Sequence, residues 1–321
     1  MRQVRELGGF QAVDDERIRA LTRAWTERYV HEELDDMQEK SGRFIHLFRR
    51  LCADGEQIVL DTVQELRRSG FEPLDFELDF SKARDIRPLA LGEGEGALTL
   101  TGVADRIDGW VHEDKLYLRV VDYKTGKKAF SLSDVWYGMG LQMLLYLFAL
   151  EENGESRYGR EIVPAGVMYL PARNVMLPVD AGAGDEEIAQ KRSDALRRSG
   201  LVLDDPALLE AWEKGEDKRY IPVKFSKRKD SADSLASLER MGQLSRHLRR
   251  TLTQMAGELH RGSIAADPYY RSQQETACLN CDYLDACYFS DGEGGESCRY
   301  LPKLSDFKVF TLLDGEGSEH A

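Results

Sequence analysis

The chain has 321 residues, enough for one large domain or two smaller ones, and 42% of them are hydrophobic. Its 44 basic and 57 acidic side chains give a formal charge of -13, which argues against a protein that grips nucleic acid over its whole surface. No apolar run approaches the ~20 residues that span a bilayer, and the charged N-terminus does not resemble a signal peptide, so we expect a cytoplasmic protein with no membrane segment.

Helical periodicity runs almost unbroken over residues 14–69 and stops at Gly70, because glycine tolerates the left-handed conformation that ends helices. Residues 71–80 then alternate apolar and acidic side chains, which predicts a half-buried strand. Glu77 is on the acidic side of this strand. We interpret it first as a solvent-facing acid and second as a residue that supports a site.

A β-hairpin is predicted next, with strands at about 97–112 and 116–124 joined by a polar turn. Period two places Asp122 and Lys124 on one face at the C-terminal end of the second strand. Asp105 lies on the first strand, and the hairpin brings it alongside them. Because Asp108 differs from Asp105 in parity, we expect Asp108 in a turn or on the surface.

An apolar segment over residues 131–152 predicts a buried helix, and Ser131 and Asp134 have the spacing of a capping box at its start. Gln142 and Tyr146 are four residues apart and so share one face of this helix. Both carry polar groups that need partners if they are buried. On its own, this pair is typical of an ordinary core helix.

The rest of the chain predicts one more core strand at 165–171, then mainly helix over 185–262 with a short strand at 220–225. No internal repeat or long linker divides the sequence, so we expect a single elaborated domain. Its expected parts are a helical lead-in (1–69), a core (70–175), a mostly helical insertion (176–265) and a cysteine-rich tail (266–321).

The acid and base pair at the end of the hairpin has two interpretations. Asp122 and Lys124 alone are most simply a surface ion pair that closes a strand. Metal-assisted hydrolysis of a phosphodiester, however, needs converging carboxylates, a polarised water and positive charge for the transition state. Asp105 supplies a second carboxylate at hairpin distance, and this addition favours a catalytic site.

The motifs "GVADRID", "VVDYKTG" and "LQMLLYL" together resemble the nuclease core of the RecB-type PD-(D/E)XK superfamily. More narrowly, the chain is similar to the C-terminal nuclease domain of the AddB family, and the similarity covers most of its length. This resemblance implies an α/β (α+β) fold with a restriction-endonuclease-like core, in which helices flank a mixed sheet.

The same resemblance implies roles for individual residues. Mg²⁺ is expected between Asp105, Asp122 and the carbonyl of Tyr123, while Lys124 orients or activates the attacking water. Gln142 and Tyr146 are expected to steady the site or the DNA backbone.

The implied function is a magnesium-dependent DNA exonuclease that cuts in the 5′ to 3′ direction on a single strand delivered from a duplex end. Such a domain works in a heterodimer with an AddA-type helicase subunit, in recombinational repair of double-strand breaks. Two alternatives stay open. One is a catalytically silent DNA-binding or scaffolding module, and the other is a stand-alone CRISPR-associated RecB-like exonuclease, against which the long segment 172–265 speaks.

RecB-like domains also use a histidine on an upstream helix, often in the spacing G-x-x-x-H. Gly42 and His46 have this spacing, but in the AddB family the motif is expected further upstream. We therefore interpret His46 first as an ordinary helix residue and second as the catalytic histidine. The first interpretation makes the chain a fragment that begins after the family histidine.

Four of the five cysteines fall within 21 residues near the C-terminus. Cys278, Cys281 and Cys287 form a C-x2-C-x5-C pattern that predicts a metal site, and spacing alone favours zinc. The resemblance instead implies a 4Fe-4S cluster that ties the tail to the start of the domain. The family's upstream fourth cysteine is absent, so Cys298 is a candidate substitute, Cys52 is interpreted as a buried thiol, and the cluster is expected to be incomplete or labile.

Overall fold

The computed structural model describes residues 1–34, 40–81, 86–87, 89–91, 98–173, 175, 177–178, 182–223, 234–294 and 296–318. The helices are α1 (Arg2–Glu6), α2 (Asp15–Glu33), α3 (Gly42–Arg68), α4 (Leu132–Trp136), α5 (Gln142–Asn153), α6 (Glu155–Tyr158), α7 (Asp185–Ala195), α8 (Pro206–Trp212), α9 (Leu238–His260), α10 (Leu284–Cys287) and α11 (Asp306–Ser318), with a 3-10 turn at Ala277–Asn280. The strands are β1 (Glu72–Asp79), β2 (Leu89–Leu91), β3 (Leu98–Leu100), β4 (Val103–His112), β5 (Lys115–Lys124), β6 (Ile162–Pro171), β7 (Ser199–Leu203), β8 (Leu235–Ala236), β9 (Tyr269–Ser272), β10 (Glu275–Thr276) and β11 (Arg299–Tyr300).

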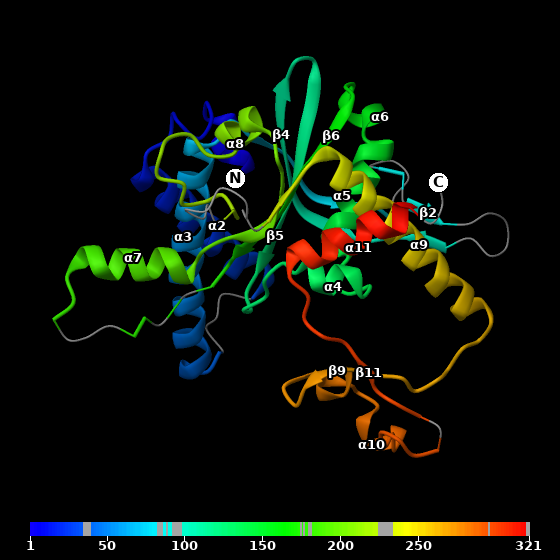
Figure 1. Cartoon of the computed structure of the whole chain (residues 1–321). Helices are drawn as coiled ribbons and strands as arrows, with labels where there is room; N and C mark the ends of the chain where they lie inside the picture. Colours follow the sequence, from blue (N-terminus) through cyan, green and yellow to red (C-terminus); the bar gives the residue numbers. More distant parts are fainter. Residues whose placement is uncertain are drawn as a thin grey trace.

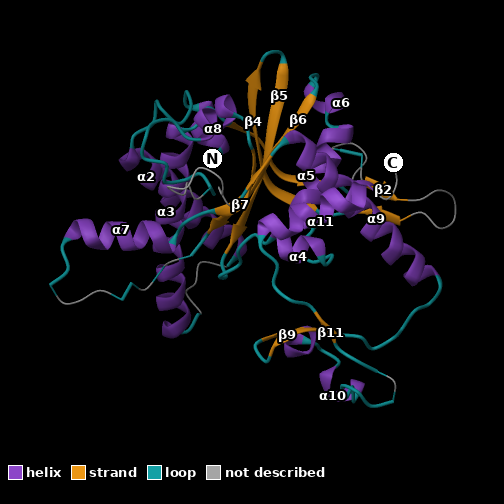
Figure 2. Ribbon diagram, viewed as in Figure 1, coloured by secondary structure: helices purple, strands orange, loops and turns teal. Residues whose placement is uncertain are grey.

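A mixed six-stranded sheet forms the centre of the molecule, in the order β1-β4-β5-β6-β7-β8 (Figure 2). β4 and β5 are the predicted hairpin, and its turn residues Glu113 and Asp114 both have positive φ, 49° and 65°. Two such residues define the turn type whose twist matches paired strands. β6 then runs parallel to β5, because the chain crosses over through α4, α5 and α6 before it returns to the sheet.

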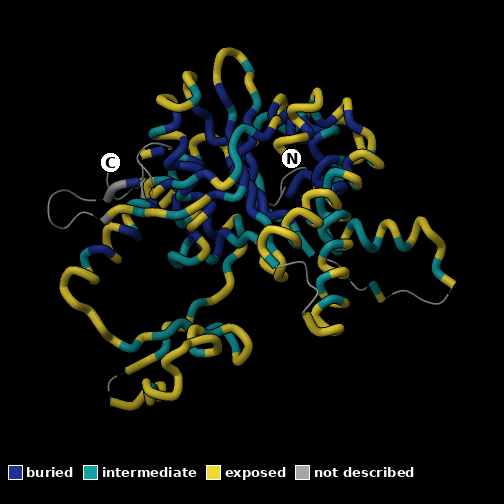
Figure 3. The backbone as a smooth tube through the Cα atoms, turned by 180° about the vertical axis from the view of Figure 1, so that it is seen from behind, coloured by how far each residue is buried: buried dark blue, intermediate teal, exposed yellow. Residues whose placement is uncertain are grey.

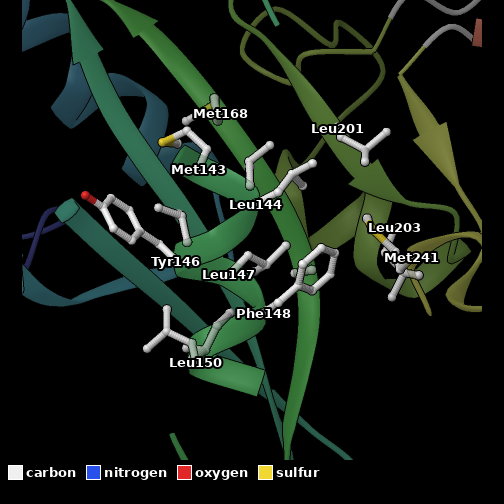
Figure 4. Close-up of a cluster of buried hydrophobic side chains, with 14 of the residues drawn as sticks. Met143, Leu144, Tyr146, Leu147, Phe148, Leu150, Met168, Leu201, Leu203 and Met241 are labelled. Atoms are coloured by element: carbon white, nitrogen blue, oxygen red, sulfur yellow. The ribbon is translucent and has the colours of Figure 1, made fainter. Parts of the chain in front are cut away.

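Helices cover both faces of this sheet, with α2 and α3 on one side and α5, α9 and α11 on the other (Figure 1). α5 packs on β5 and β6, and Figure 4 shows Leu144 and Leu147 clustered beside Met168 of β6. A helix that is apolar nearly all round belongs in such a buried layer. No helix in the described ranges is both long and apolar enough to cross a membrane.

Most predicted elements are present, with four differences. The first strand of the hairpin, expected at about 97–112, is divided into β3, which pairs with β2, and β4. The helix expected over 131–152 begins as predicted, since Ser131 Oγ accepts a hydrogen bond of 3.2 Å from the backbone N–H of Asp134. It is nevertheless two helices, α4 and α5, because Gly138 and Gly140 adopt φ of 79° and 65° between them. A left-handed residue breaks the helical hydrogen-bond ladder. As a consequence, Gln142 is the first residue of α5 and does not lie in the middle of one long helix.

The segment 185–262 was expected to be mainly helical, yet its residues 199–203 form β7, a strand of the central sheet. This strand was missed because it opens with Ser and Gly, which have low strand propensity. Residue 200 must be glycine because the backbones of β7 and β6 approach closely there: a Cβ would lie 2.0 Å from the carbonyl oxygen of Val167 in β6. Residues 220–223 form no strand, and residues 224 and 225 lie outside the described part of the chain.

Candidate active site

β4 and β5 separate at one end of their ladder. The last registered pair is Arg106 with Val121, and one step further the side chain of Asp105 enters the gap between the strands. Its Oδ2 accepts a hydrogen bond of 2.8 Å from the backbone N–H of Tyr123. β4 meanwhile stays paired with β1 as far as Val103. We call this opening the fork, and it comprises Asp105, Asp122, Tyr123 and Lys124.

Asp122 and Lys124 project together from the end of β5, as period two predicts. Lys124 Nζ lies 2.6 Å from Asp122 Oδ2, and it also lies 5.4 Å from the centre of the Tyr169 ring on β6. Asp122 is only 6% exposed. Burial raises the pKa of its carboxyl above the usual range, and repulsion from Asp105 adds to this against the attraction of Lys124.

The oxygen atoms of the fork fit a hard divalent cation. Two carboxylates that repel each other in a partly buried position are relieved by a cation between them. Mg²⁺ prefers oxygen ligands and is commonly held by one or two carboxylates while it keeps several waters. Asp105, Asp122 and the carbonyl of Tyr123 are therefore the candidate ligands, although no group of three or more His, Cys, Asp or Glu side chains in the described ranges is placed to hold a metal ion.

Gln142 and Tyr146 contact each other, as their spacing predicts: Gln142 Nε2 donates a hydrogen bond of 3.0 Å to Tyr146 Oη. The Tyr146 ring stacks on Phe80, with 4.7 Å between centroids. Figure 4 shows its oxygen directed away from the aliphatic cluster of α5. A Cβ on Gly102 would lie 2.1 Å from this oxygen, so the hydroxyl lies beside the chain that leads into β4 and Asp105.

A hollow of about 600 Å³ opens beside the fork and is lined by Asp105 and Tyr123, by Glu77 of β1 and by residues of α3 such as Ile58 and Thr62. Glu77 is exposed, as the solvent-facing interpretation predicts, and it lines this hollow together with Asp105. Its φ of 55° is unusual for a strand residue other than glycine. Such local strain is found most often near functional sites.

His46 is an exposed residue of α3. It lies near the start of α3 and does not line the hollow. Ile58, which does line it, lies 12 residues later, and at 1.5 Å per residue this is about 18 Å along the helix axis.

The sequence prediction for Asp108 was wrong. It was expected in a turn or on the surface, but it is completely buried and carries ion pairs to Arg106 at 2.8 Å and Arg119 at 2.9 Å. Its parity was predicted correctly, but the face opposite to Asp105 is covered by α3. A cluster of buried charged side chains fills this interface, hereafter the ionic cluster: Asp61, Glu65, Arg106, Asp108, Arg119 and Arg198.

Glu65 of α3 is the centre of the ionic cluster. One of its oxygens lies 3.3 Å from Arg106 Nη2 and 3.2 Å from Arg119 Nη2, and the other lies 3.2 Å from Arg198 Nη2. Arg198 in turn pairs with Asp61 at 2.6 Å. With three acids and three arginines the cluster is formally neutral, as buried charges must nearly be.

The ionic cluster touches the fork through Tyr123. Arg106 Nη1 donates a hydrogen bond of 2.7 Å to Tyr123 Oη. Burial raises the pKa of the Tyr123 hydroxyl, which stays protonated, and Arg106 opposes that rise only in part. The residue between Asp122 and Lys124 is thus anchored from the opposite face of the sheet. Sequence reasoning missed this cluster, although Arg119 inside the apolar strand "LYLRVVD" was a signal that a charge is buried there.

The cysteine tail forms a small lobe of β9, β10, β11 and α10 outside the main body (Figure 1). None of the described residues from 261 to 308 is buried, and Figure 3 shows the lobe without a core. It is attached to the α4 region, for example by an ion pair of 2.6 Å between Arg271 and Asp134. A unit with so little burial needs another source of stability, such as a metal or disulfides.

The described residues include no three ligating side chains placed to hold a metal, so the structure does not gather Cys278, Cys281 and Cys287 into a ligand set. Cys298 is close enough to Cys278 to interact with it electrostatically. Desolvation, Asp291 and Cys278 all raise the pKa of the Cys298 thiol. Cys52 is half-buried on α3, and burial raises the pKa of its thiol as well.

The fold and the fork define the class of protein. Residues 2–288 match the family model of the PD-(D/E)XK nuclease superfamily. The chain therefore belongs to this superfamily, and the fold and nuclease class predicted from the sequence are confirmed.

Curated relatives share one description, the B-type subunit of an ATP-dependent helicase/deoxyribonuclease. The chain is 31% identical to the protein of this name from Acetivibrio thermocellus over 314 residues, which are 94% of this chain and 27% of that protein. It is 35% identical over 255 residues to the one from Desulforudis audaxviator, with 77% of this chain and 22% of that protein covered. The chain thus spans about a quarter of the length of these relatives.

Proposed function

We propose that this chain is a magnesium-dependent deoxyribonuclease domain of a B-type helicase-nuclease subunit, in which the fork is the catalytic site. The observation that carries this proposal is the meeting of Asp105, Asp122 and Lys124 at the end of the β4–β5 ladder. The names of the curated relatives support DNA as the substrate and a helicase subunit as the partner.

Each residue of the fork has a distinct role in this proposal. Asp105, Asp122 and the carbonyl of Tyr123 hold the ion, which when bound supplies a polarised water and positive charge for the transition state. Lys124 keeps its ammonium group beside Asp122 and orients the attacking water or compensates charge on the phosphate. Gln142 and Tyr146, joined by their hydrogen bond, contact the DNA backbone next to the metal.

The finer features of the proposal rest on the sequence resemblance. They are exonucleolytic cutting in the 5′ to 3′ direction, a single strand delivered by an AddA-type helicase subunit, and a role in repair of double-strand breaks. The 4Fe-4S cluster on Cys278, Cys281 and Cys287 is a further proposal. It is supported by the C-x2-C-x5-C pattern and by a lobe in which no described residue is buried.

A catalytically silent module is the alternative, and the fork speaks against it. A degenerate relative has no need to preserve two facing carboxylates with a lysine beside them, since Asp122 is held in an unfavourable, partly buried position. Retention of an acid in this unfavourable position is more consistent with a catalytic site than with a silent module.

The test is degradation of linear DNA by the purified chain with Mg²⁺, beside Asp122→Ala and Lys124→Ala. We expect each substitution to lower the rate by about 100-fold or more, as removal of a group that acts in the transition state usually does. Glu161→Gln is the matched control, because it removes an exposed acid just before β6, at the end of the strand opposite to the fork. Equal cutting by all four proteins would show that the fork is not the catalytic site.

A further inference from the structure

A second hollow, with a volume of about 250 Å³, lies between α3 and α7 at the C-terminal end of β6. This space can hold several water molecules, each of which occupies about 30 Å³ in the liquid. Three arginines line it: Arg173 just after β6, Arg192 on α7, and Arg219. We call it the arginine cavity. It is a concentration of positive charge in a chain whose net charge is -13.

The acids of the arginine cavity do not cancel this charge. Asp54 and Asp61 also line it, but Asp61 belongs to the ionic cluster, where Arg198 lies 2.6 Å away, and Arg219 approaches its other oxygen at 3.5 Å. Neither Arg173 nor Arg192 forms an ion pair with a carboxylate in the described part of the chain. Three arginines thus line the cavity beside two aspartates, and Asp61 already pairs with Arg198.

Arg173 also has an unused donor. Its Nε is buried and has no hydrogen-bond partner among the described residues, while its Nη2 only approaches the carbonyl oxygen of Ala195 at 3.5 Å. Buried donors are nearly always satisfied, by protein, water or a ligand. Within the described part of the chain, this Nε–H is therefore free to donate to a water or a ligand in the cavity.

The arginine cavity lies next to the fork and to the hollow beside it. Pro171, on its wall, is the β6 partner of Lys124 on β5, and paired strands lie about 4.8 Å apart. Ile58 of α3 lines both the arginine cavity and the hollow beside the fork. An extended ligand held in one hollow can therefore continue into the other.

We propose that the arginine cavity binds a backbone phosphate of the single DNA strand whose scissile phosphate lies at the fork. Arginine presents a planar set of donors that fits phosphate oxygens. No aromatic side chain is among the described lining residues, so the cavity has no platform for stacking a base and fits the sugar-phosphate backbone instead. This site deepens the proposed nuclease function and rests on it.

The test is binding of a fluorescein-labelled oligothymidylate to the metal-free full chain, measured by anisotropy over a range of NaCl concentrations. The double variant Arg173→Gln, Arg192→Gln should weaken binding about tenfold or more at low salt. It should also reduce the slope of log K against log salt by about 1, since fewer phosphates are neutralised. Lys191→Gln is the control, because Lys191 is the neighbour of Arg192 on α7 but pairs with Glu187 and does not line the cavity.

Three outcomes separate the two proposals. Unchanged affinity and salt slope in the double variant, with normal folding by circular dichroism, overturn the phosphate site even if Asp122→Ala abolishes cleavage. An equal loss of affinity in Lys191→Gln overturns it too, because the effect is then one of general charge. If binding is lost in the double variant but not in Lys191→Gln, and the wild type cuts no DNA, the phosphate site is supported and the nuclease function is excluded.

Discussion

The backbone N–H of Tyr123 donates a hydrogen bond of 2.8 Å to Asp105, so the two strands that carry the carboxylates are joined at the point where their ladder ends. The side chain of the same tyrosine is held by Arg106 on the opposite face of the sheet. Arg106 is held by Glu65 of α3 and by Asp108. The fork is therefore anchored to a buried set of charges on the opposite face of the sheet.

Replacement of Tyr123 by Phe tests this anchor. The substitution leaves a buried guanidinium donor of Arg106 without its acceptor, which costs about 1–3 kcal/mol of unfolding free energy. Because the backbone of Tyr123 is kept, we expect a fold that is intact but a fork that is looser, with Mn²⁺ affinity reduced several-fold in calorimetric titration. Tyr117→Phe on the same strand is the control, and an equal effect there would contradict the assignment.

Glu65→Ala should be among the most damaging substitutions in the chain. It leaves Arg106, Arg119 and Arg198 buried with too little negative charge, and removal of one partner from a buried set costs about 3–5 kcal/mol. Urea unfolding monitored by circular dichroism measures this loss. Glu56→Ala, also on α3, removes an ion pair to the exposed Arg23 and should cost much less, because solvent screens exposed ion pairs. Similar losses in both variants would contradict a special role of the ionic cluster.

Asp122→Asn should raise thermal stability while it removes activity. A carboxyl whose pKa is raised on folding binds more protons in the folded than in the unfolded state, so Asp122 lowers stability as pH rises above its unfolded pKa of 3.8. At pH 7 the neutral amide avoids this cost, and the melting temperature should equal or exceed that of the wild type. The difference should shrink as pH is lowered toward 4.

Mg²⁺ should reverse the order of the two melting temperatures, so that the wild type becomes more stable than Asp122→Asn. At a metal concentration 100 times Kd, binding stabilises the wild type by about 2.7 kcal/mol. The Asn variant lacks one of the charged ligands and should gain much less. A wild-type melting temperature that does not respond to Mg²⁺, or an equal response in both proteins, would speak against metal binding at Asp122.

Gly102→Ala probes the position of Tyr146. A Cβ at residue 102 would lie 2.1 Å from Tyr146 Oη, so the ring must move and its hydrogen bond with Gln142 is disturbed. We expect slower DNA cleavage, about as slow as that of Tyr146→Phe, with little change in metal affinity. Gly126→Ala is the matched control, since a Cβ there meets no atom within 4 Å. Cleavage as fast in Gly102→Ala as in this control would exclude Tyr146 from the site.

The cysteine tail yields a prediction of its own. Anaerobically purified protein should be brown and contain iron, and Cys281→Ser should lose the iron and make the lobe sensitive to protease, because no buried residue in its described part otherwise holds it. Cys52→Ser on α3 should keep both the iron and the resistance. Colourless protein with one equivalent of zinc would replace the iron-sulfur proposal.

The local sequence pattern was sufficient to predict the residues of the fork that are close together in the sequence. Period two put Asp122 and Lys124 on one face, and hairpin pairing brought Asp105 to them, because both follow from strand geometry alone. The contact between Gln142 and Tyr146 likewise follows from helical spacing.

Long-range packing set the limit of prediction. Asp108 was assigned to the wrong environment because the ionic cluster it joins draws on separate elements, such as Glu65 of α3 and Arg119 of β5, and nothing near "DRID" shows that α3 covers this face. The arginine cavity was missed for the same reason: Arg173 and Arg192 meet only because β6 and α7 fold against α3. Residues that support a site from a distance in sequence carry no local signature.

The most direct test of the account is the position of a bound metal. Crystals soaked in MnCl₂ should show one anomalous peak within coordination distance of Asp105, Asp122 and the carbonyl oxygen of Tyr123, and none in crystals of Asp122→Ala. A peak elsewhere in an active protein, or an active protein that binds no metal at the fork, would contradict the assignment of this fork as the catalytic centre.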